Sequence, residues 1–184
     1  MPQMRSLAFL LLFDWIGASV IIPQENFDLD RFMGRWYEVA VVSDCPHYMQ
    51  NKRQNPVIVT LDLKLREQGN INVLVAAPRN GSCKHTATHF TLTDVGGQFF
   101  CHVARHNVDV DAYVVHTNYD HYAMMGLLSM EVSSQNKSTI FKLFNRSSDG
   151  RHAALDDFKR LVRKHEMRDD NIIFNGKRDS NTCS

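Results

Sequence analysis

The chain has 184 residues, of which 43% are hydrophobic and 22% are charged. This length suits one globular domain, and the apolar content is sufficient to fill a core, which excludes a largely disordered protein. The 21 Lys and Arg residues nearly balance the 20 Asp and Glu residues, so the formal charge is +1. Nucleic-acid-binding proteins usually carry a strong basic excess, so no nucleic-acid partner is expected.

The N-terminus has the layout of a secretory signal peptide. Arg5 precedes an apolar run over residues 7–13, and small residues follow at 17–19. Asp14 interrupts the apolar stretch, which is therefore much shorter than the roughly 18 residues that span a bilayer. We predict a signal peptide over residues 1–18, one domain over residues 19–184, secretion to the extracellular space and no membrane span.

Alternation of apolar and polar residues dominates the rest of the chain. In residues 57–65 the apolar side chains of Val57, Val59, Leu61, Leu63 and Leu65 share one face, which is typical of a strand with one buried side. Similar segments are separated by short turns rich in Gly and Asn. The pattern predicts eight strands over residues 36–42, 57–65, 71–75, 86–93, 99–103, 112–117, 122–128 and 139–144.

One late segment follows a different period. Leu155, Phe158, Leu161 and Val162 fall at helical spacing, which predicts a helix over residues 151–166, and a short final strand is predicted over residues 171–174. Many short strands with short turns indicate an all-β fold, either a sandwich or an up-and-down barrel. A closed eight-stranded barrel can hold one small ligand, and its cavity would be lined by the inward faces of residues 57–65, 71–75 and 124–128.

The chain contains four cysteines after the predicted signal peptide, at positions 45, 83, 101 and 183, which a secreted protein can keep as disulfides. Four cysteines allow three complete pairings, and spacing does not select among them. The spacing does not fit a zinc knuckle, and no metal site is expected. Asn80, Asn136 and Asn145 each begin an Asn-x-Ser triplet and are candidate glycosylation sites.

Three short motifs, in order along the chain, resemble those of the lipocalin family. Gly34 and Trp36 form the first motif, and Arg146 ends the third. The second contains Thr117, Tyr119 and Tyr122, with Asn118 where the family usually has Asp. The resemblance implies an eight-stranded antiparallel up-and-down lipocalin barrel with a C-terminal α-helix and a short final strand. It also implies that Arg146 packs over the ring of Trp36, a structural contact without chemistry.

Within the family, the chain is similar to the alpha-1-microglobulin group in residues 24–27, 34–40, 43–46 and 113–123. No Kunitz-type cysteine pattern follows, so protease inhibition is not expected. The resemblance implies a small hydrophobic ligand, with haem-like or radical species as first candidates and no obligatory cofactor. It further implies a mouth-loop thiol at Cys45, a ligand-binding lysine at Lys142 and a disulfide between Cys83 and Cys183.

Three possibilities remain open for Cys45. It could serve a thiol-based reductase or scavenger activity, it could form a disulfide with a plasma protein, or it could pair with Cys101. His116 and His121 flank the second motif and are candidate haem ligands near a barrel end. Prostaglandin-D synthase, a lipocalin enzyme, needs a cysteine on its second strand. None lies between Cys45 and Cys83 here, so that activity is not expected.

Overall fold

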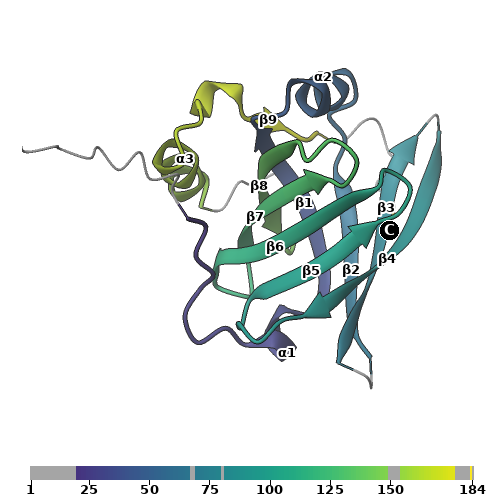
Figure 1. Ribbon diagram of the computed structural model, residues 1–184, viewed down its shortest axis with the longest axis vertical. Helices are drawn as coiled ribbons and strands as arrows, with labels where there is room; N and C mark the ends of the chain where they lie inside the picture. The colour runs from purple at the N-terminus through teal and green to yellow at the C-terminus, as the bar shows by residue number, and fades with distance from the viewer. Residues whose placement is uncertain (1–19, 67–68, 80, 149–153, 177–182, 184) are drawn as a thin grey trace, which may run out of the picture.

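The computed structural model describes residues 20–66, 69–79, 81–148, 154–176 and 183. The predicted signal peptide therefore lies outside the described residues, as does Asn80. Eight antiparallel strands pair in sequence order, and the first strand pairs with both the second and the eighth, which closes the barrel (Figure 1). The strands are β1 (Gly34–Ser43), β2 (Val59–Leu65), β3 (Asn70–Arg79), β4 (Ser82–Leu92), β5 (Gln98–Val103), β6 (Val108–Thr117), β7 (Tyr122–Glu131) and β8 (Lys137–Asn145).

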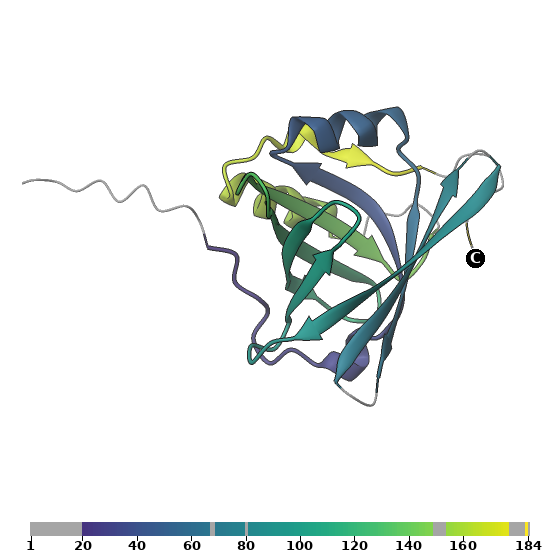
Figure 2. The same cartoon turned by 45° about the vertical axis from the view of Figure 1, so that its right-hand side comes forward.

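The remaining elements cover the two ends and one side of the barrel (Figures 1 and 2). Helix α1 (Leu29–Phe32) lies at one end, and helix α2 (Pro46–Gln54) lies across the other. Helix α3 (Leu155–Lys164) packs outside β8 and is followed by a 3-10 turn, η1 (Asp169–Asn171). The short strand β9 (Ile173–Phe174) pairs with β1 at Ala40 and Val41. The predicted barrel, helix and final strand are therefore confirmed.

Helix α3 is shorter than predicted. It begins at Leu155 because Ala154, at its N-terminus, has a left-handed backbone with φ of 63°. It ends near His165, and Glu166 again has a left-handed φ of 58°. A non-glycine residue in this conformation interrupts the helical hydrogen-bond pattern. Within the helix, Phe158 and Val162 are fully buried and belong to a cluster with Phe141 and Leu143 of β8.

The register of β1 changes once, at a bulge between Glu38 and Ala40. β1 pairs with β2 from Gly34 to Glu38, with β8 from Tyr37 to Ser43 on both sides of the bulge, and with β9 only beyond it. The chain after β9 fills the space where β1 leaves β2, since Gly176 donates a backbone hydrogen bond to Pro56 and forms a parallel bridge with Val57. A bulge of this kind redirects the side chains that follow it.

None of the helices in the described residues combines the length and the apolar character that a bilayer crossing demands.

Candidate functional site: the barrel mouth

A cavity of about 800 Å³ lies at the end of the barrel that α2 covers. Its walls come from α2, from the segment that joins β1 to α2, and from the ends of β5, β6, β7 and β8 with their turns. The lining combines apolar side chains from the strands with polar and charged side chains. The lining residues are Asp44, Cys45, Pro46, His47, Tyr48, Asn51, Val103, His106, Val108, Val110, Ser129, Glu131, Asn136, Lys137, Ser138 and Ile140.

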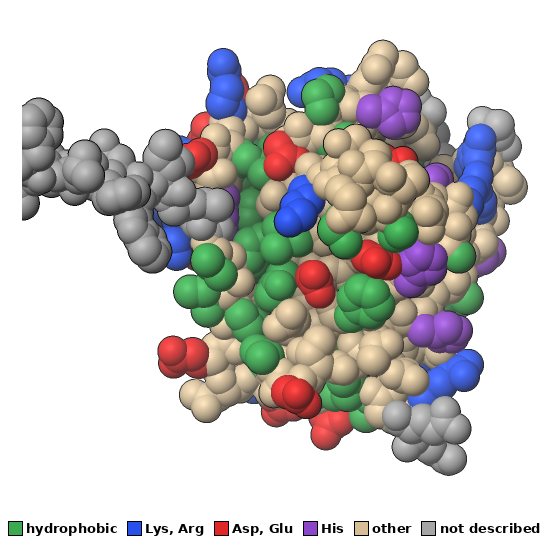
Figure 3. Space-filling model, viewed as in Figure 1, with side chains coloured by type: hydrophobic (Ala, Val, Ile, Leu, Met, Phe, Trp, Pro, Cys, Tyr) green, Lys and Arg blue, Asp and Glu red, His purple; other side chains and the backbone are tan. Residues whose placement is uncertain are grey.

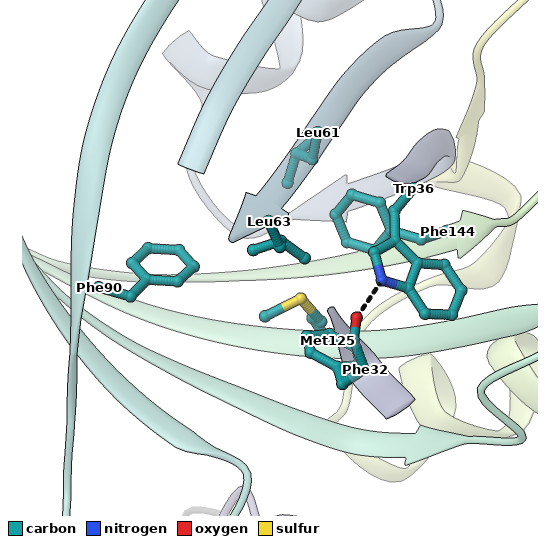
Figure 4. Close-up of a pocket in the computed structure, with 7 residues that line it drawn as sticks. All are labelled: Phe32, Trp36, Leu61, Leu63, Phe90, Met125 and Phe144. Carbon is teal, nitrogen blue, oxygen red and sulfur yellow. Dashed lines mark hydrogen bonds between the residues drawn. The ribbon is translucent and has the colours of Figure 1, made fainter. Parts of the chain in front are cut away.

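Deeper in the barrel, seven apolar side chains surround a small space (Figure 4). A cavity of about 10 Å³ lies among seven apolar side chains there, which is room for one water molecule at most. Leu61 and Leu63 of β2 point toward Met125 of β7 in this region. The residues around it are Phe32, Trp36, Leu61, Leu63, Phe90, Met125 and Phe144. The mouth, and not the lower barrel, therefore offers the space for a ligand.

A buried charged cluster lies inside the barrel beneath α2. Glu38 is on the same face of β1 as Trp36, and its side chain is 2% exposed. Lys52 from α2 donates to its Oε1 at 2.6 Å, and Lys142 from β8 donates to its Oε2 at 2.7 Å. The Nδ2 of Asn175 also donates to Oε1, at 3.0 Å. One carboxylate therefore holds the helix, two strands and the C-terminal segment together.

The pKa values of the cluster follow from these contacts. Burial alone would raise the pKa of Glu38, but the ammonium groups of Lys142 and Lys52 outweigh it and lower the pKa from 4.5 to about 2. Burial alone would lower the pKa of Lys142, but the Glu38 carboxylate and a hydrogen bond with Tyr48 raise it above its ordinary value. Burial raises the pKa of the Tyr48 phenol. Lys142 is thus protonated and ion-paired, whereas a reactive lysine needs a neutral amine.

Cys45 and Cys101 are both free thiols. Cys45 precedes α2 and lines the mouth cavity, where its backbone N–H donates to the Ser43 hydroxyl at 3.0 Å. Cys101 is buried, on the same face of β5 as the cavity residue Val103. Burial, with a smaller contribution from Asp109 and Asp111, raises the pKa of the Cys101 thiol to about 11. The structure therefore contradicts the alternative in which Cys45 and Cys101 form a disulfide.

Cys83 and Cys183 form a disulfide, with their Cα atoms 5.7 Å apart. The bond ties the C-terminus to β4, 100 residues earlier in the chain. The Cys183 carbonyl also accepts a hydrogen bond from the hydroxyl of Thr60, which is only 3% exposed. This hydrogen bond explains how Thr60, which lies on the face of β2 opposite Leu61 and Leu63, can be buried.

The three motif segments meet at the end of the barrel opposite α2. The Arg146 guanidinium lies 3.6 Å from the centre of the Trp36 ring, and the indole N–H of Trp36 donates to the Phe32 carbonyl at 2.8 Å. Arg146 also donates to the carbonyls of Tyr119 and Arg35, each at 2.8 Å. Gly34, with φ of 93°, lies close to this guanidinium, so a side chain there would be both strained and crowded.

The second motif forms the turn beside the contact between Arg146 and Trp36. The Thr117 hydroxyl donates to the Tyr122 carbonyl at 2.7 Å and accepts from the Tyr119 N–H at 2.9 Å. The unusual Asn118 accepts from the backbone N–H groups of His121 and Tyr122 through its side-chain oxygen. Asn therefore performs the turn-closing role that an Asp carboxylate can also perform.

The histidine candidates lie away from the mouth cavity. His116 is exposed on β6 and stacks on Tyr122. His121 is exposed in the turn between β6 and β7 that the second motif forms. Other histidines gather at the surface over β4 and β5 (Figure 3). In the part of the chain that the structure describes, no group of three or more His, Cys, Asp or Glu side chains is arranged to hold a metal ion.

The two described glycosylation candidates differ in exposure. Asn136 is exposed in the segment that precedes β8. Asn145 is 3% exposed at the end of β8, where it pairs with both Tyr37 and Tyr122 in the sheet register. A glycan on the Asn145 side chain would have to displace packed strands, so this candidate is not compatible with the folded barrel.

Sequence reasoning missed the partners of Lys142, namely Glu38, Lys52, Tyr48 and Asn175. One signal was available: Glu38 stands two residues after Trp36, directly before the apolar run 39–42. An acidic residue on the inward face of a strand implies a buried cation nearby. The sequence does not reveal which cation, because Lys52 and Lys142 come from elements 14 and 104 residues away.

A family model and related proteins place the chain in one family, and a solved structure shares its fold. The model of the lipocalin / cytosolic fatty-acid binding protein family matches residues 33–179. Protein AMBP of Pleuronectes platessa is 42% identical over 174 residues, which cover 90% of this chain and 48% of that protein. Protein AMBP of Bos taurus is 34% identical over 171 residues, with 86% and 48% covered.

The chain thus spans about half the length of the AMBP proteins that it matches. A lipocalin of Rhinella marina is 27% identical over 157 residues, covering 85% of this chain and 84% of that protein. The structure of the siderocalin Ex-FABP has a TM-score of 0.66 at 20% identity and covers 82% of this chain and 97% of the siderocalin, a likeness of fold. Together with the closed barrel, the match over residues 33–179 shows that this chain belongs to the lipocalin / cytosolic fatty-acid binding protein family, whose members bind small hydrophobic ligands.

Proposed function

We propose that this chain binds a small, largely apolar molecule in the mouth cavity, with haem-like tetrapyrroles or radical species as first candidates. The observation that carries the proposal is the cavity of about 800 Å³ with Val103, Val108, Val110 and Ile140 among its lining residues. Small-molecule sites are mostly apolar clefts of roughly 300–1,000 Å³ with a few polar groups. For iron, the fitting donors in the cavity are His47, His106 and Cys45, in place of His116 and His121.

The test fills the cavity with a side chain. Ser129 lines the cavity, whereas the adjacent Leu128 is 38% exposed, on the opposite face of β7. Ser129→Trp should abolish saturable binding of haemin, retinol or a long-chain fatty acid. Leu128→Trp, the matched control, should bind as the unmodified chain does. Binding is followed by Soret absorbance and by fluorescence. Equal binding by both variants would place the ligand elsewhere, and no binding of any candidate by the unmodified chain would reject the proposal.

A second candidate function rests on the free Cys45 thiol at the cavity wall. In thiol–disulfide exchange, the Cys45 thiolate would attack a partner's disulfide, forming one mixed disulfide and releasing one thiol. This chemistry would serve a reductase or scavenger activity or a covalent link to a plasma protein. Cys45→Ser should remove the adduct formed with oxidised glutathione, detected by intact mass. An adduct that persists in the variant would exclude Cys45.

We also propose that the chain is secreted. The apolar leader of residues 1–18 and the Cys83–Cys183 disulfide support this proposal, because disulfides persist in oxidising compartments. Expression of the full chain in a eukaryotic secretory host tests it. The expected result is mature protein in the medium that begins near residue 19, whereas retention of the intact leader inside the cell would contradict it.

A further inference from the structure

A hollow of about 490 Å³ lies on the outer surface of the barrel, where β2, β3 and β4 run side by side (Figure 2). Asp62 and Lys64 point outward there, because they alternate along β2 with Leu61 and Leu63, which point into the barrel. The hollow shares no lining residue with the mouth cavity. We call it the basic groove, and its lining residues are Arg35, Asp62, Lys64, Arg66, Asn72, Val73, Leu74, Ala87, Thr88 and His89.

Positive charge collects in the basic groove. Arg35, Lys64 and Arg66 contribute three cations, whereas Asp62 is the only acid among the described residues that line it. With His89 neutral, the lining carries a net charge of +2, although the formal charge of the whole chain is +1. The groove therefore carries more net positive charge than the whole chain does.

Two of the three cations have no acidic partner. Nε and Nη2 of Arg35 donate to the two carboxylate oxygens of Asp62, at 2.9 and 3.1 Å, which occupies the one carboxylate of the groove. Lys64 and Arg66 are exposed, and no acidic side chain in the described part of the chain forms an ion pair with either. They stand two residues apart, about 7 Å along the strand direction. The groove therefore presents a short row of cations to an external anion.

Neutral hydrogen-bond donors extend this row across the sheet. Asn72 is paired with Lys64 on one side and with His89 on the other. Nδ1 of His89 donates to Oδ1 of Asn72 at 2.6 Å, because an amide oxygen can only accept. Within the described residues, the amide N–H groups of Asn72 then have no partner, so they can donate to the same anion as Lys64.

The form of the basic groove favours a polymer over a single small anion. Each exposed charge contact contributes little by itself, so stable binding needs one molecule that engages several cations at once. None of the described lining residues is Phe, Tyr or Trp, the side chains on which nucleic-acid bases stack. Leu74, 43% exposed, is the one large exposed apolar side chain in the lining, which is too little apolar surface for insertion into a membrane.

We propose that the basic groove binds a sulfated polysaccharide, whose sulfate groups pair with Lys64 and Arg66 and accept hydrogen bonds from Asn72. A linear chain with regularly spaced sulfates can follow the row of cations along β2. This site is separate from the mouth cavity, so the inference does not depend on the ligand proposed for that cavity.

The first measurement records binding of the unmodified chain to immobilised heparin by surface plasmon resonance. Saturable binding is expected at about 0.15 M NaCl, and the affinity should fall steeply as the salt concentration rises, because salt screens exposed charges. Hyaluronan, which carries carboxylates but no sulfates, should bind at least about 10-fold more weakly. Vesicles that contain phosphatidylserine should not bind.

Substitutions in the groove should move the affinity in both directions. Lys64→Glu with Arg66→Glu reverses the two unpaired cations and should weaken heparin binding at least about 10-fold. Asp62→Asn removes the acid of the groove and should tighten binding about 2- to 5-fold. The matched control, Arg105→Glu with Lys164→Glu, makes the same change in net charge at exposed positions outside the groove and should change the affinity less than about 2-fold.

The outcomes decide the proposal. If the charge-reversed pair does not fold, Lys64→Gln with Arg66→Gln replaces it and should weaken binding about 3- to 10-fold. An equal loss in the groove variant and in the control would show that only the overall charge matters and would overturn the proposal. It would also be overturned if hyaluronan bound as tightly as heparin, if vesicles bound and heparin did not, or if heparin did not bind the unmodified chain.

Discussion

Protonation of Glu38 should control the acid stability of the barrel. Its carboxylate is buried and accepts hydrogen bonds from Lys52, Lys142 and Asn175. Because its pKa is lowered from 4.5 to about 2 on folding, the contribution to stability is present above pH 4.5 and is lost as the pH falls through 2. The difference corresponds to about 3 kcal/mol in favour of the folded state, of which about 2 kcal/mol should already be lost at pH 3.

The substitution Glu38→Gln isolates this contribution. At pH 6 the variant should be less stable than the unmodified chain by about 3 kcal/mol, within the range for breaking a buried ion pair. The difference should shrink as the pH falls, because a protonated Glu38 is also neutral. Urea unfolding, followed by circular dichroism from pH 7 to pH 2, measures the free energy of unfolding of both proteins.

The matched control is Glu25→Gln, which changes an exposed carboxylate. It should alter stability by less than about 0.5 kcal/mol at every pH. A stability difference between the unmodified chain and Glu38→Gln that is the same at pH 6 and pH 3 would refute the reasoning, because the cost would then not come from the charge of Glu38.

Three further predictions concern the cysteines and Arg146. Replacing Cys183 with Ser opens a covalent link between residues 100 apart and should lower the free energy of unfolding by about 3–5 kcal/mol, measured in urea; an unchanged midpoint would mean that the link contributes nothing. At pH 8, Cys45 should react with a disulfide reagent well before Cys101, whose buried thiol has a raised pKa; equal rates of the two thiols would contradict this order. Arg146→Ala removes the contact with Trp36 and the hydrogen bonds to the carbonyls of Tyr119, Arg35 and Arg31. It should cost about 2–4 kcal/mol in thermal or urea unfolding, whereas a change below about 0.5 kcal/mol would show that water replaces those bonds.

The strand order and the barrel class were predictable from local features. Alternation with a period of two places one face of residues 57–65 inward, and short turns force neighbouring strands to pair. The three motifs located Trp36 and Arg146, which meet because the first and last strands must lie together in a closed barrel. The late helix was visible in its apolar spacing, but its start was not, since the left-handed Ala154 gives no signal in composition.

What individual side chains do depended on contacts between distant elements. Lys142 alternates with apolar neighbours in β8 as a surface lysine would, and only the closed barrel places it against Glu38. Asn145 is in an acceptor triplet, yet two flanking strands bury it. His116 and His121 stand beside a conspicuous motif, but that motif belongs to the end of the barrel opposite α2. Local sequence determines which face of a strand a residue takes, whereas the closure of the barrel decides what that face meets, because each contact joins segments that are far apart along the chain.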